Sequence, residues 1–215
     1  MRDSAQWWLQ LEASLQRNRV HAFARYFQVA TVRPNGRPAN RTVVYRGAVQ
    51  RGDDCAPYLT FVSDMRSKKH DDFEKCSWCE ICWYLPVTRE QYRITGYAEV
   101  VDASNDELLR RTTRQQIWAR LTPPLQAPFF APTPGMPLQA ASASDTTISV
   151  DEAGVPETFG LVLVLPTRVD HLQLANSNGR PPHRTCYYRH ALQPEEVAAD
   201  PSSEPEIWQA ESVQP

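Results

Sequence analysis

Residues 27–49 read FQVATVRPNGRPANRTVVYRGAV, and this stretch decides the fold class. Segments 27–32 and 40–49 are rich in valine, threonine and aromatic residues, which favour β-strands. Between them, Pro34, Asn35 and Gly36 form a turn signal. Neighbouring strands with so short a connection pair antiparallel. The stretch therefore predicts a β-hairpin.

The same alternation of strands and short connections continues toward the C-terminus. Further strands are predicted at residues 58–63, 77–85, 91–101, 159–165, 168–174 and 184–189. Pro166 is expected to break the pattern between two of them, and Ile207 and Trp208 are expected to lie in a last strand. Many short strands with few helices predict a mainly β, antiparallel barrel or sandwich.

Three helices are predicted around this sheet. They cover about residues 4–17, 68–75 and 104–121. Ser67 is the expected N-cap of the second helix. Ser104, with Glu107 three residues later, is the expected capping box of the third.

Length, charge and cysteine content set the broad class. The 215 residues are expected to form one domain, residues 1–215, and the net charge of −2 argues against nucleic-acid or anionic-membrane partners. No apolar run approaches the roughly 20 residues that span a bilayer. The N-terminus lacks a signal-peptide layout, and the five cysteines favour a reducing compartment. A cytoplasmic protein is therefore expected.

Residues 122–157 differ from the rest of the chain in composition. They hold seven prolines and a run of small residues at 140–144. A long loop of this kind inside a compact domain is functional or mobile. This segment is expected to be partly disordered, above all at about 138–155.

The basic run Arg66-Ser67-Lys68-Lys69 is the sharpest candidate for chemistry. It follows a predicted strand and opens a predicted helix, where free N–H groups attract anions. Cations at a helix N-terminus oppose the helix dipole, which is easier to understand if an anion occupies the site. The run predicts a phosphate-binding site, and the alternative is a solvated basic turn.

Residues in two of the predicted strands are weaker candidates. Arg41 lies inside a strand, where it either faces solvent or binds an anion through its planar guanidinium. Gln91 and Arg93 share one face of the strand at 91–101, and a glutamine there can bond the edge of a heterocycle.

Other chemistries have less support. Cys76, Cys79 and Cys82 have the spacing of metal ligands, but a strand would place Cys79 on the opposite face from the other two. Half-buried strand residues are the preferred interpretation, so no metal is expected. Gly-x-Gly-x-x-Gly, P-loop and Gly-x-Ser-x-Gly motifs do not occur.

Taken in order, several short motifs resemble one known family. They are Arg-x-Val-Val at 41–44, Ser67-Lys68-Lys69 between a strand and a helix, and Gln-x-Arg-Ile-x-Gly at 91–96. Further along come Arg110-Arg111 with Trp118, Pro-x-Pro-Gly at 132–135, Arg180-Pro-Pro-His-Arg184, and Trp208 near the end. The chain resembles the pyridoxamine 5′-phosphate oxidase family, and within it the oxidase-like FMN-binding branch of cyanobacteria and plants.

This resemblance implies a split β-barrel homodimer with FMN at the subunit interface. It implies that Arg41 and Lys69 hold the FMN phosphate, that Gln91 bonds the flavin ring, and that Arg184 approaches from the other subunit. Lys68 stands where the family has an arginine, and Ser63 where a threonine is usual. The full implied cofactor set is Arg41, Thr42, Val43, Val44, Ser63, Lys68, Lys69, Gln91 and Arg184.

The implied substrate side matches the family less well. Arg46, Arg111 and Arg180 correspond to substrate-binding arginines. The family's tyrosine, serine, tryptophan and histidine positions hold other residues, namely Glu107, Gln115, Leu172 and Pro182.

The resemblance implies oxidation of pyridoxamine or pyridoxine 5′-phosphate to pyridoxal 5′-phosphate by hydride transfer to FMN, with O₂ as acceptor. The flavin carries the chemistry, so no catalytic side chain is assigned. The alternatives are a flavin-binding module or flavin reductase without vitamin B6 activity, and a nucleic-acid-binding barrel.

Overall fold

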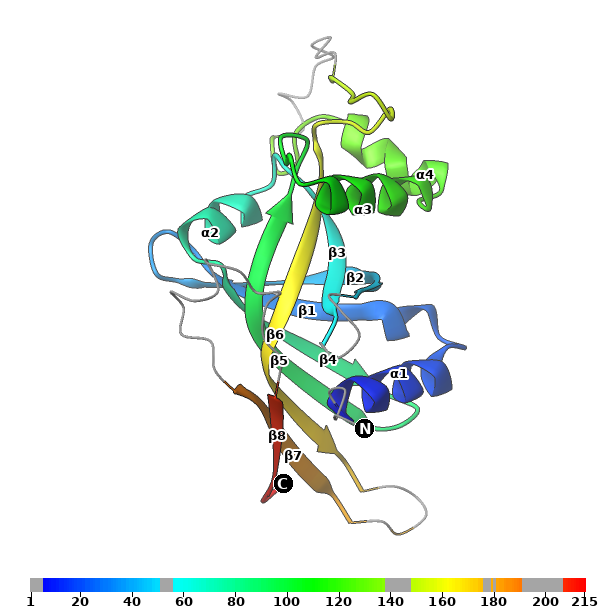
Figure 1. Cartoon of the computed structure of the whole chain (residues 1–215), viewed down its shortest axis with the longest axis vertical. Helices are drawn as coiled ribbons and strands as arrows, with labels where there is room; N and C mark the ends of the chain where they lie inside the picture. Colours follow the sequence, from blue (N-terminus) through cyan, green and yellow to red (C-terminus); the bar gives the residue numbers. More distant parts are fainter. Residues whose placement is uncertain (1–5, 51–55, 138–147, 176–178, 180, 191–206) are drawn as a thin grey trace.

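Eight antiparallel strands form the body of the molecule in the computed structural model (Figure 1). The structure describes residues 6–50, 56–137, 148–175, 179, 181–190 and 207–215. The strands are β1 (Tyr26–Val32), β2 (Pro38–Val49), β3 (Tyr58–Asp64), β4 (Trp78–Leu85), β5 (Glu90–Val101), β6 (Phe159–Gln173), β7 (His183–His190) and β8 (Ile207–Val213). The predicted mainly β class is confirmed.

Six of these strands close a barrel. Their order is β3-β2-β1-β4-β5-β6, and β3 also pairs with β6. The hairpin β1–β2 has the expected register, with Phe27 opposite Val43 and Val29 opposite Arg41. The second half of β6 leaves the barrel and pairs with β7, which pairs with β8. Trp208 therefore lies in a last strand, as predicted.

Helices and short turns cover the barrel. They are α1 (Gln6–Asn18), η1 (Ala22–Arg25), α2 (Lys69–Lys75), α3 (Leu108–Ala119), α4 (Pro123–Gln126) and η2 (Ala127–Phe130). Figure 1 places α1 beside the lower part of β4 and α3 with α4 near the upper end of β6. No described helix is long and apolar enough to cross a membrane.

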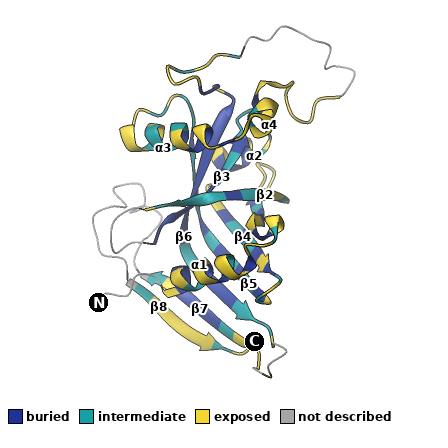
Figure 2. Ribbon diagram, turned by 90° about the vertical axis from the view of Figure 1, so that its right-hand side faces the viewer, coloured by how far each residue is buried: buried dark blue, intermediate teal, exposed yellow. Residues whose placement is uncertain are grey.

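Alternating burial along the strands builds the core (Figure 2). In β5 every second residue from Glu90 to Ala98 is buried, as the two-residue period of a strand requires. Phe27, Phe61 and Trp83 meet inside the barrel, with ring centroids 5.1–6.0 Å apart. A second apolar cluster, around Trp118 and Phe159, lies under α3.

The predicted break at Pro166 does not occur. β6 runs unbroken from Phe159 to Gln173, and the pairing register with β5 shifts between Thr95 and Gly96, where Gly96 faces Pro166. A bulge accommodates a proline because one ladder hydrogen bond is already missing there. A Cβ on Gly96 would collide with the backbone of Leu165, so this position requires glycine.

Both predicted capping motifs are wrong. The Ser67 hydroxyl donates back to the Asp64 carbonyl (2.6 Å), and α2 begins at Lys69. The Ser104 hydroxyl donates to Asp102 (2.7 Å). Helix α3 begins at Leu108, with Glu107 in the N-cap position. In both cases a nearby acceptor competes for the serine hydroxyl.

Part of the proline-rich segment forms short helices, and its predicted partial disorder, above all at about 138–155, stays a prediction. Residues 123–130 form α4 and η2, and Phe129 and Val155 are buried. Arg114, fully buried in α3, donates hydrogen bonds to the carbonyls of Phe159 (2.9 Å) and Pro156 (2.7 Å). Residues 138–147, and the start of the first predicted helix at residues 4–5, lie outside the described residues.

Candidate functional site

Lys69 is the centre of a polar cluster where β3 passes into α2. Its ammonium donates to the hydroxyls of Ser63 (2.9 Å) and Ser67 (2.8 Å). Burial lowers the pKa of Lys69, and the positive charge of Arg41 lowers it further. A lysine held among hydroxyls beside a second cation favours binding of an anion, which would stabilise its charged form.

His70 closes the buried side of this cluster. Its Nε2 lies 3.1 Å from the Ser63 hydroxyl, and only 5% of the residue is exposed. Burial, followed by the charge of Lys69, lowers the pKa of His70, which keeps the ring neutral near pH 7. Its Nδ1 is buried without a partner among the described residues.

Arg41 reaches the cluster from β2. Its guanidinium donates to Thr31 Oγ1 (2.6 Å) and to Asp72 Oδ2 (2.9 Å), and Thr31 donates to the same carboxylate oxygen (2.6 Å). Asp72 on α2 is almost fully buried, and its carboxylate holds the guanidinium of Arg41 in place. The guanidinium keeps further N–H groups for another acceptor, since it has five.

The predicted basic run contributes one cation, Lys69, and the hydroxyl of Ser67. Arg66 is engaged instead by Asp64, with N–O distances of 2.9 and 2.6 Å, and by the Ala131 carbonyl (2.8 Å). Lys68 is exposed at the N-cap position of α2. Thr42, Val43 and Val44 follow Arg41 along β2, with Val43 opposite the buried Phe27.

The donor set of the cluster fits a phosphate monoester. An ammonium, a guanidinium and two hydroxyls converge, and such charge-assisted donors are the ones that bind phosphate in proteins. Asp72 neutralises part of Arg41, so the cation of Lys69 is the main unpaired charge near Ser63 and Ser67. This cluster of Arg41, Ser63, Ser67 and Lys69 is called the phosphate cluster below.

Gln91 and Arg184 belong to a second group, on the outer face of the sheet. Gln91 of β5 lies opposite Leu172 of β6, and Leu172 lies opposite Arg184 of β7. Side chains directly opposite in an antiparallel ladder share a face. Arg184 donates to both oxygens of Asp170 (2.9 and 2.6 Å).

The two groups are far apart in one chain. Ser63 pairs with Gly160 near the start of β6, whereas Gln91 pairs with Leu172 near its end. At about 3.3 Å per residue, roughly 40 Å of strand separates these positions. One FMN molecule, with a ribityl chain between ring and phosphate, does not reach from one group to the other.

The expected substrate arginines have different surroundings. Arg46 lies at a bulge of β2, and its Nε is buried without a partner among the described residues. Burial lowers the pKa of Arg46, and the charge of Arg25 lowers it further. Arg111 is exposed on α3. Arg180 lies outside the described residues.

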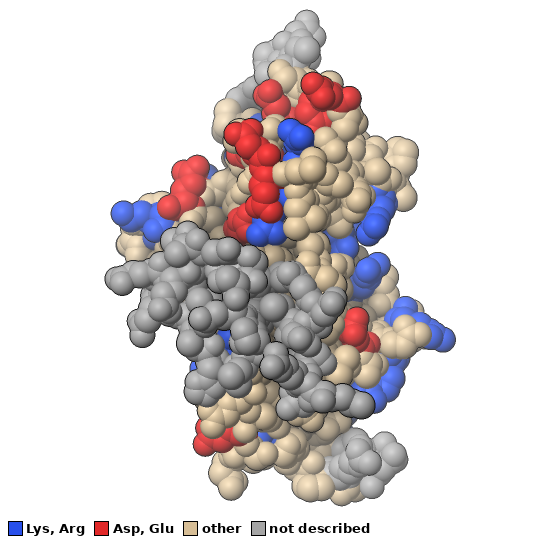
Figure 3. All heavy atoms as spheres, viewed as in Figure 1, with Lys and Arg blue, Asp and Glu red and all other residues tan. Residues whose placement is uncertain are grey.

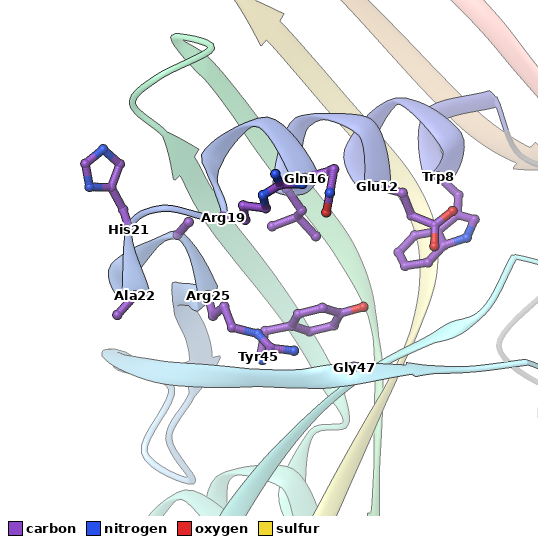
Figure 4. A pocket seen from close by; sticks show the side chains of 11 residues that line it. Trp8, Glu12, Gln16, Arg19, His21, Ala22, Arg25, Tyr45 and Gly47 are labelled. Atoms are coloured by element: carbon purple, nitrogen blue, oxygen red, sulfur yellow. The ribbon is translucent and has the colours of Figure 1, made fainter.

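A cleft of about 450 Å³ lies between α1, η1 and β2 (Figure 4). Arg25 and Tyr45 lie next to each other beneath α1, which contributes Trp8 and Glu12. No member of the phosphate cluster lines this cleft. The cleft is therefore a separate feature of the surface.

The cysteine motif takes up the expected strand geometry in part. Cys79 is buried and Cys82 is half-buried on the opposite face of β4, while Cys76 precedes the strand. Among the described residues, no group of three His, Cys, Asp or Glu is placed to hold a metal ion.

On the face viewed in Figure 3, acidic side chains gather over the upper part and basic ones along the right edge.

Three important residues were not predicted from the sequence: His70, Asp72 and Asp170. A helix at about 68–75 was expected, but the pattern did not show which of its polar residues turn inward. Asp170 alternates with the buried Val169 in the sequence, yet it is itself 4% exposed because two arginines cover it.

Comparisons with known proteins settle the family. Residues 4–102 match the family model described as pyridoxamine 5′-phosphate oxidase, FMN-binding domain. Pyridoxine/pyridoxamine 5′-phosphate oxidase 2 of Arabidopsis thaliana is 34% identical over 170 residues, which are 79% of this chain and 84% of that protein. The chain belongs to the pyridoxamine 5′-phosphate oxidase family. The expected FMN cofactor and oxidoreductase class are thereby confirmed.

Solved structures agree with this family. A pyridoxamine 5′-phosphate oxidase-related, FMN-binding protein of Nostoc punctiforme is 34% identical, with a TM-score of 0.78 and 98% of each chain covered. PhzG of Burkholderia lata, solved with tetrahydrophenazine-1-carboxylic acid, has a TM-score of 0.69 at 16% identity. It covers 100% of this chain and 94% of its own, and shows the fold alone. The fold is therefore the split barrel of this family.

Proposed function

We propose that this protein is an FMN-dependent oxidoreductase that holds the FMN phosphate in the phosphate cluster. The observation that carries the proposal is the contact of the Lys69 ammonium with Ser63 and Ser67, beside Arg41. These residues lie where the family motifs predict a phosphate site. Lys68, exposed beside them, adds positive charge without a fixed contact.

FMN, when bound, accepts a hydride from a substrate carbon that bears an amine or an alcohol. The residues of this chain bind the cofactor and orient it. Lys69 and Arg41 neutralise the phosphate, and the Ser63 hydroxyl, which contacts Lys69 and His70, is a further hydrogen-bonding group beside it. Thr42, Val43 and Val44 supply the strand backbone and side chains next to Arg41.

We further propose a homodimer, in which the second group of one chain faces the phosphate cluster of its partner. The support is the separation of roughly 40 Å along β6, which excludes contact of one FMN with both groups of one chain. In such a dimer, the two-fold axis would set each group of one subunit against the other group of its partner. Gln91 and Arg184 would then come from the same subunit, because they share one face of the sheet.

Pyridoxamine or pyridoxine 5′-phosphate is the proposed substrate, with O₂ as the electron acceptor. The support is the name of the Arabidopsis relative and the pair Arg25 and Arg46. The Nε of Arg46 has no acceptor among the described residues, and a substrate phosphate would supply one. Arg111 and Arg180 complete the proposed substrate set.

Reduced thiols at Cys76, Cys79, Cys82 and Cys186 support a cytoplasmic location.

Anaerobic flavin bleaching tests the substrate. The purified holoprotein is mixed with pyridoxamine 5′-phosphate or pyridoxine 5′-phosphate, and flavin absorbance is followed. Reduction by either compound supports the proposal. No reduction by either one retires the vitamin B6 assignment and leaves FMN binding intact.

A second candidate is a flavin-binding module or flavin reductase for another small molecule. The observation that favours it is the replacement of four family positions by Glu107, Gln115, Leu172 and Pro182. Glu107 places a carboxylate at the start of α3, 3.6 Å from Arg110 and four residues before Arg111. Bleaching by a reduced nicotinamide, but by neither B6 phosphate, would favour this candidate.

A further inference from the structure

Asp170 holds Arg184 in one geometry. The carboxylate accepts from Arg184 Nε at 2.9 Å and from Nη2 at 2.6 Å, which is a bidentate pair. The Asp170 side chain is 5% exposed, and that of Arg184 is 31% exposed. The carboxylate is therefore buried beneath the guanidinium, and the guanidinium remains open on its other side.

The strand register explains why these two residues meet. Asp170 lies opposite Cys186, and Arg184 lies opposite Leu172, so Asp170 and Arg184 are diagonal neighbours on one face of β6 and β7. Arg93 approaches the same carboxylate (3.8 Å) and is held by Glu80 at 2.9 Å. The hydrogen bond from Arg184 keeps the pKa of Asp170 below its usual range.

This pairing leaves a defined set of donors on Arg184. Two of the five guanidinium N–H groups point to Asp170, and the remaining three point away from it. An unpaired arginine on a β-strand would sample many rotamers, and ordering it costs conformational entropy at the moment of binding. Because the Asp170 carboxylate is buried, the pair holds the partly exposed guanidinium of Arg184 in one orientation.

We propose that Asp170 is a positioning residue, which presents the free edge of the Arg184 guanidinium to the flavin. This inference rests on the proposed function, in which Arg184 approaches FMN. Asp170 itself does not touch the cofactor. Its effect on FMN binding passes entirely through Arg184.

A double-mutant cycle on the full-length protein tests this. Apoprotein is prepared for the wild type and for Asp170→Asn, Arg184→Ala and the double variant, and FMN affinity is measured by quenching of flavin fluorescence. Asp170→Asn should weaken FMN binding about fivefold in the wild-type background, the usual size for contacting residues. It should change the affinity less than twofold when Arg184 is already alanine. Glu80→Gln is the matched control, since it removes a carboxylate of the same network without touching Arg184, and it should leave the affinity within twofold.

The outcomes separate this inference from the proposed function. If Arg184→Ala weakens binding but Asp170→Asn does not, the positioning role is overturned and the proposed function stands. Equal losses from Asp170→Asn in both backgrounds also overturn it, because they show a structural effect. If Arg184→Ala leaves FMN affinity unchanged, the assignment of Arg184 to the flavin is wrong, and the positioning role of Asp170 is overturned with it. If the Asp170→Asn variant does not fold, Asp170→Glu replaces it in the cycle. We then expect a smaller loss of FMN affinity, and only in the background that keeps Arg184.

Discussion

Lys69 is the residue on which the phosphate assignment depends most. It is the one lysine of the basic run whose ammonium is enclosed, and its two acceptors are hydroxyls rather than carboxylates. A carboxylate partner would neutralise it, whereas hydroxyls orient it and leave its charge available. Arg41, by contrast, is already paired with Asp72. We therefore expect Lys69 to contribute more to FMN affinity than Arg41.

Replacement of both cations should weaken FMN binding. The double change Lys69→Ala with Arg41→Ala is expected to lower FMN affinity at least tenfold, because charge-assisted hydrogen bonds contribute about 1.5–3 kcal/mol each. Titration of apoprotein with FMN measures this. Lys75→Ala, an exposed lysine at the other end of α2, is the control and should have no effect. Unchanged affinity in the double variant would show that the phosphate binds elsewhere.

As pH rises, FMN affinity should begin to fall at a lower pH than it would if Lys69 had the pKa of an ordinary lysine. Burial and Arg41 hold the pKa of Lys69 below its usual value of about 10.4. FMN binds the protonated form, so affinity is highest below this lowered pKa and falls as pH rises through it. Lys69→Arg should remove the decline, because arginine stays charged. Identical alkaline profiles for the two proteins would contradict this role.

For single residues, the sequence predicted only part of the phosphate cluster and its surroundings. The motif order predicted that Arg41, Ser63 and Lys69 serve one ligand, and the structure does bring them together. It did not separate Lys69 from Arg66, because the competing Asp64 two residues earlier forms a local ion pair that residue types alone do not reveal. The buried partners His70 and Asp72 depend on how α2 is rotated against β1.

Among the elements, α3 and the connection after it are tied to the barrel by one buried arginine. Arg114 contacts two backbone carbonyls and the carboxylate of Asp151 (3.0 Å). These contacts fix residues 151–159 against the helix. The predicted poor order at about 138–155 stays a prediction. Residues 148–155 lie in the described part of the chain, and proline content could not reveal the contact between Arg114 and Asp151 there.

Loss of Arg114 should destabilise the fold. Arg114→Ala is expected to lower the free energy of unfolding by about 3 kcal/mol, because it leaves buried acceptors unpaired. Urea denaturation measures it. Arg111→Ala, three residues earlier and exposed, should change the free energy by less than about 0.5 kcal/mol. Similar values for the two variants would mean that Arg114 does not hold this segment.

Sequence patterns predicted most elements of the barrel because strand periodicity is a local property. They failed at Pro166, where two segments are one strand. The bulge that admits this proline is a feature of the pairing between β5 and β6, which only the closed barrel defines. The predicted caps at Ser67 and Ser104 failed because the two hydroxyls bond to Asp64 and Asp102, and the helices begin later, at Lys69 and Leu108.

For the whole molecule, the proposed homodimer builds each FMN site from both subunits, and mixed dimers test this. Chains carrying Lys69→Ala with Arg41→Ala, and chains carrying Arg184→Ala, should each bind FMN poorly alone. When the two chains are co-expressed, mixed dimers contain one intact site, so tight FMN binding should return at about one site per mixed dimer. Affinity-tagged purification and FMN titration measure this. No recovery in purified mixed dimers would contradict sites built from two subunits.

The central claim is that this chain binds FMN, and the flavin content of the purified protein tests it most directly. The protein is denatured, and the released flavin is identified by chromatography and quantified against chain concentration. We predict FMN, at about one molecule per chain, either as purified or after incubation with added FMN. A colourless protein that takes up no FMN would contradict the account.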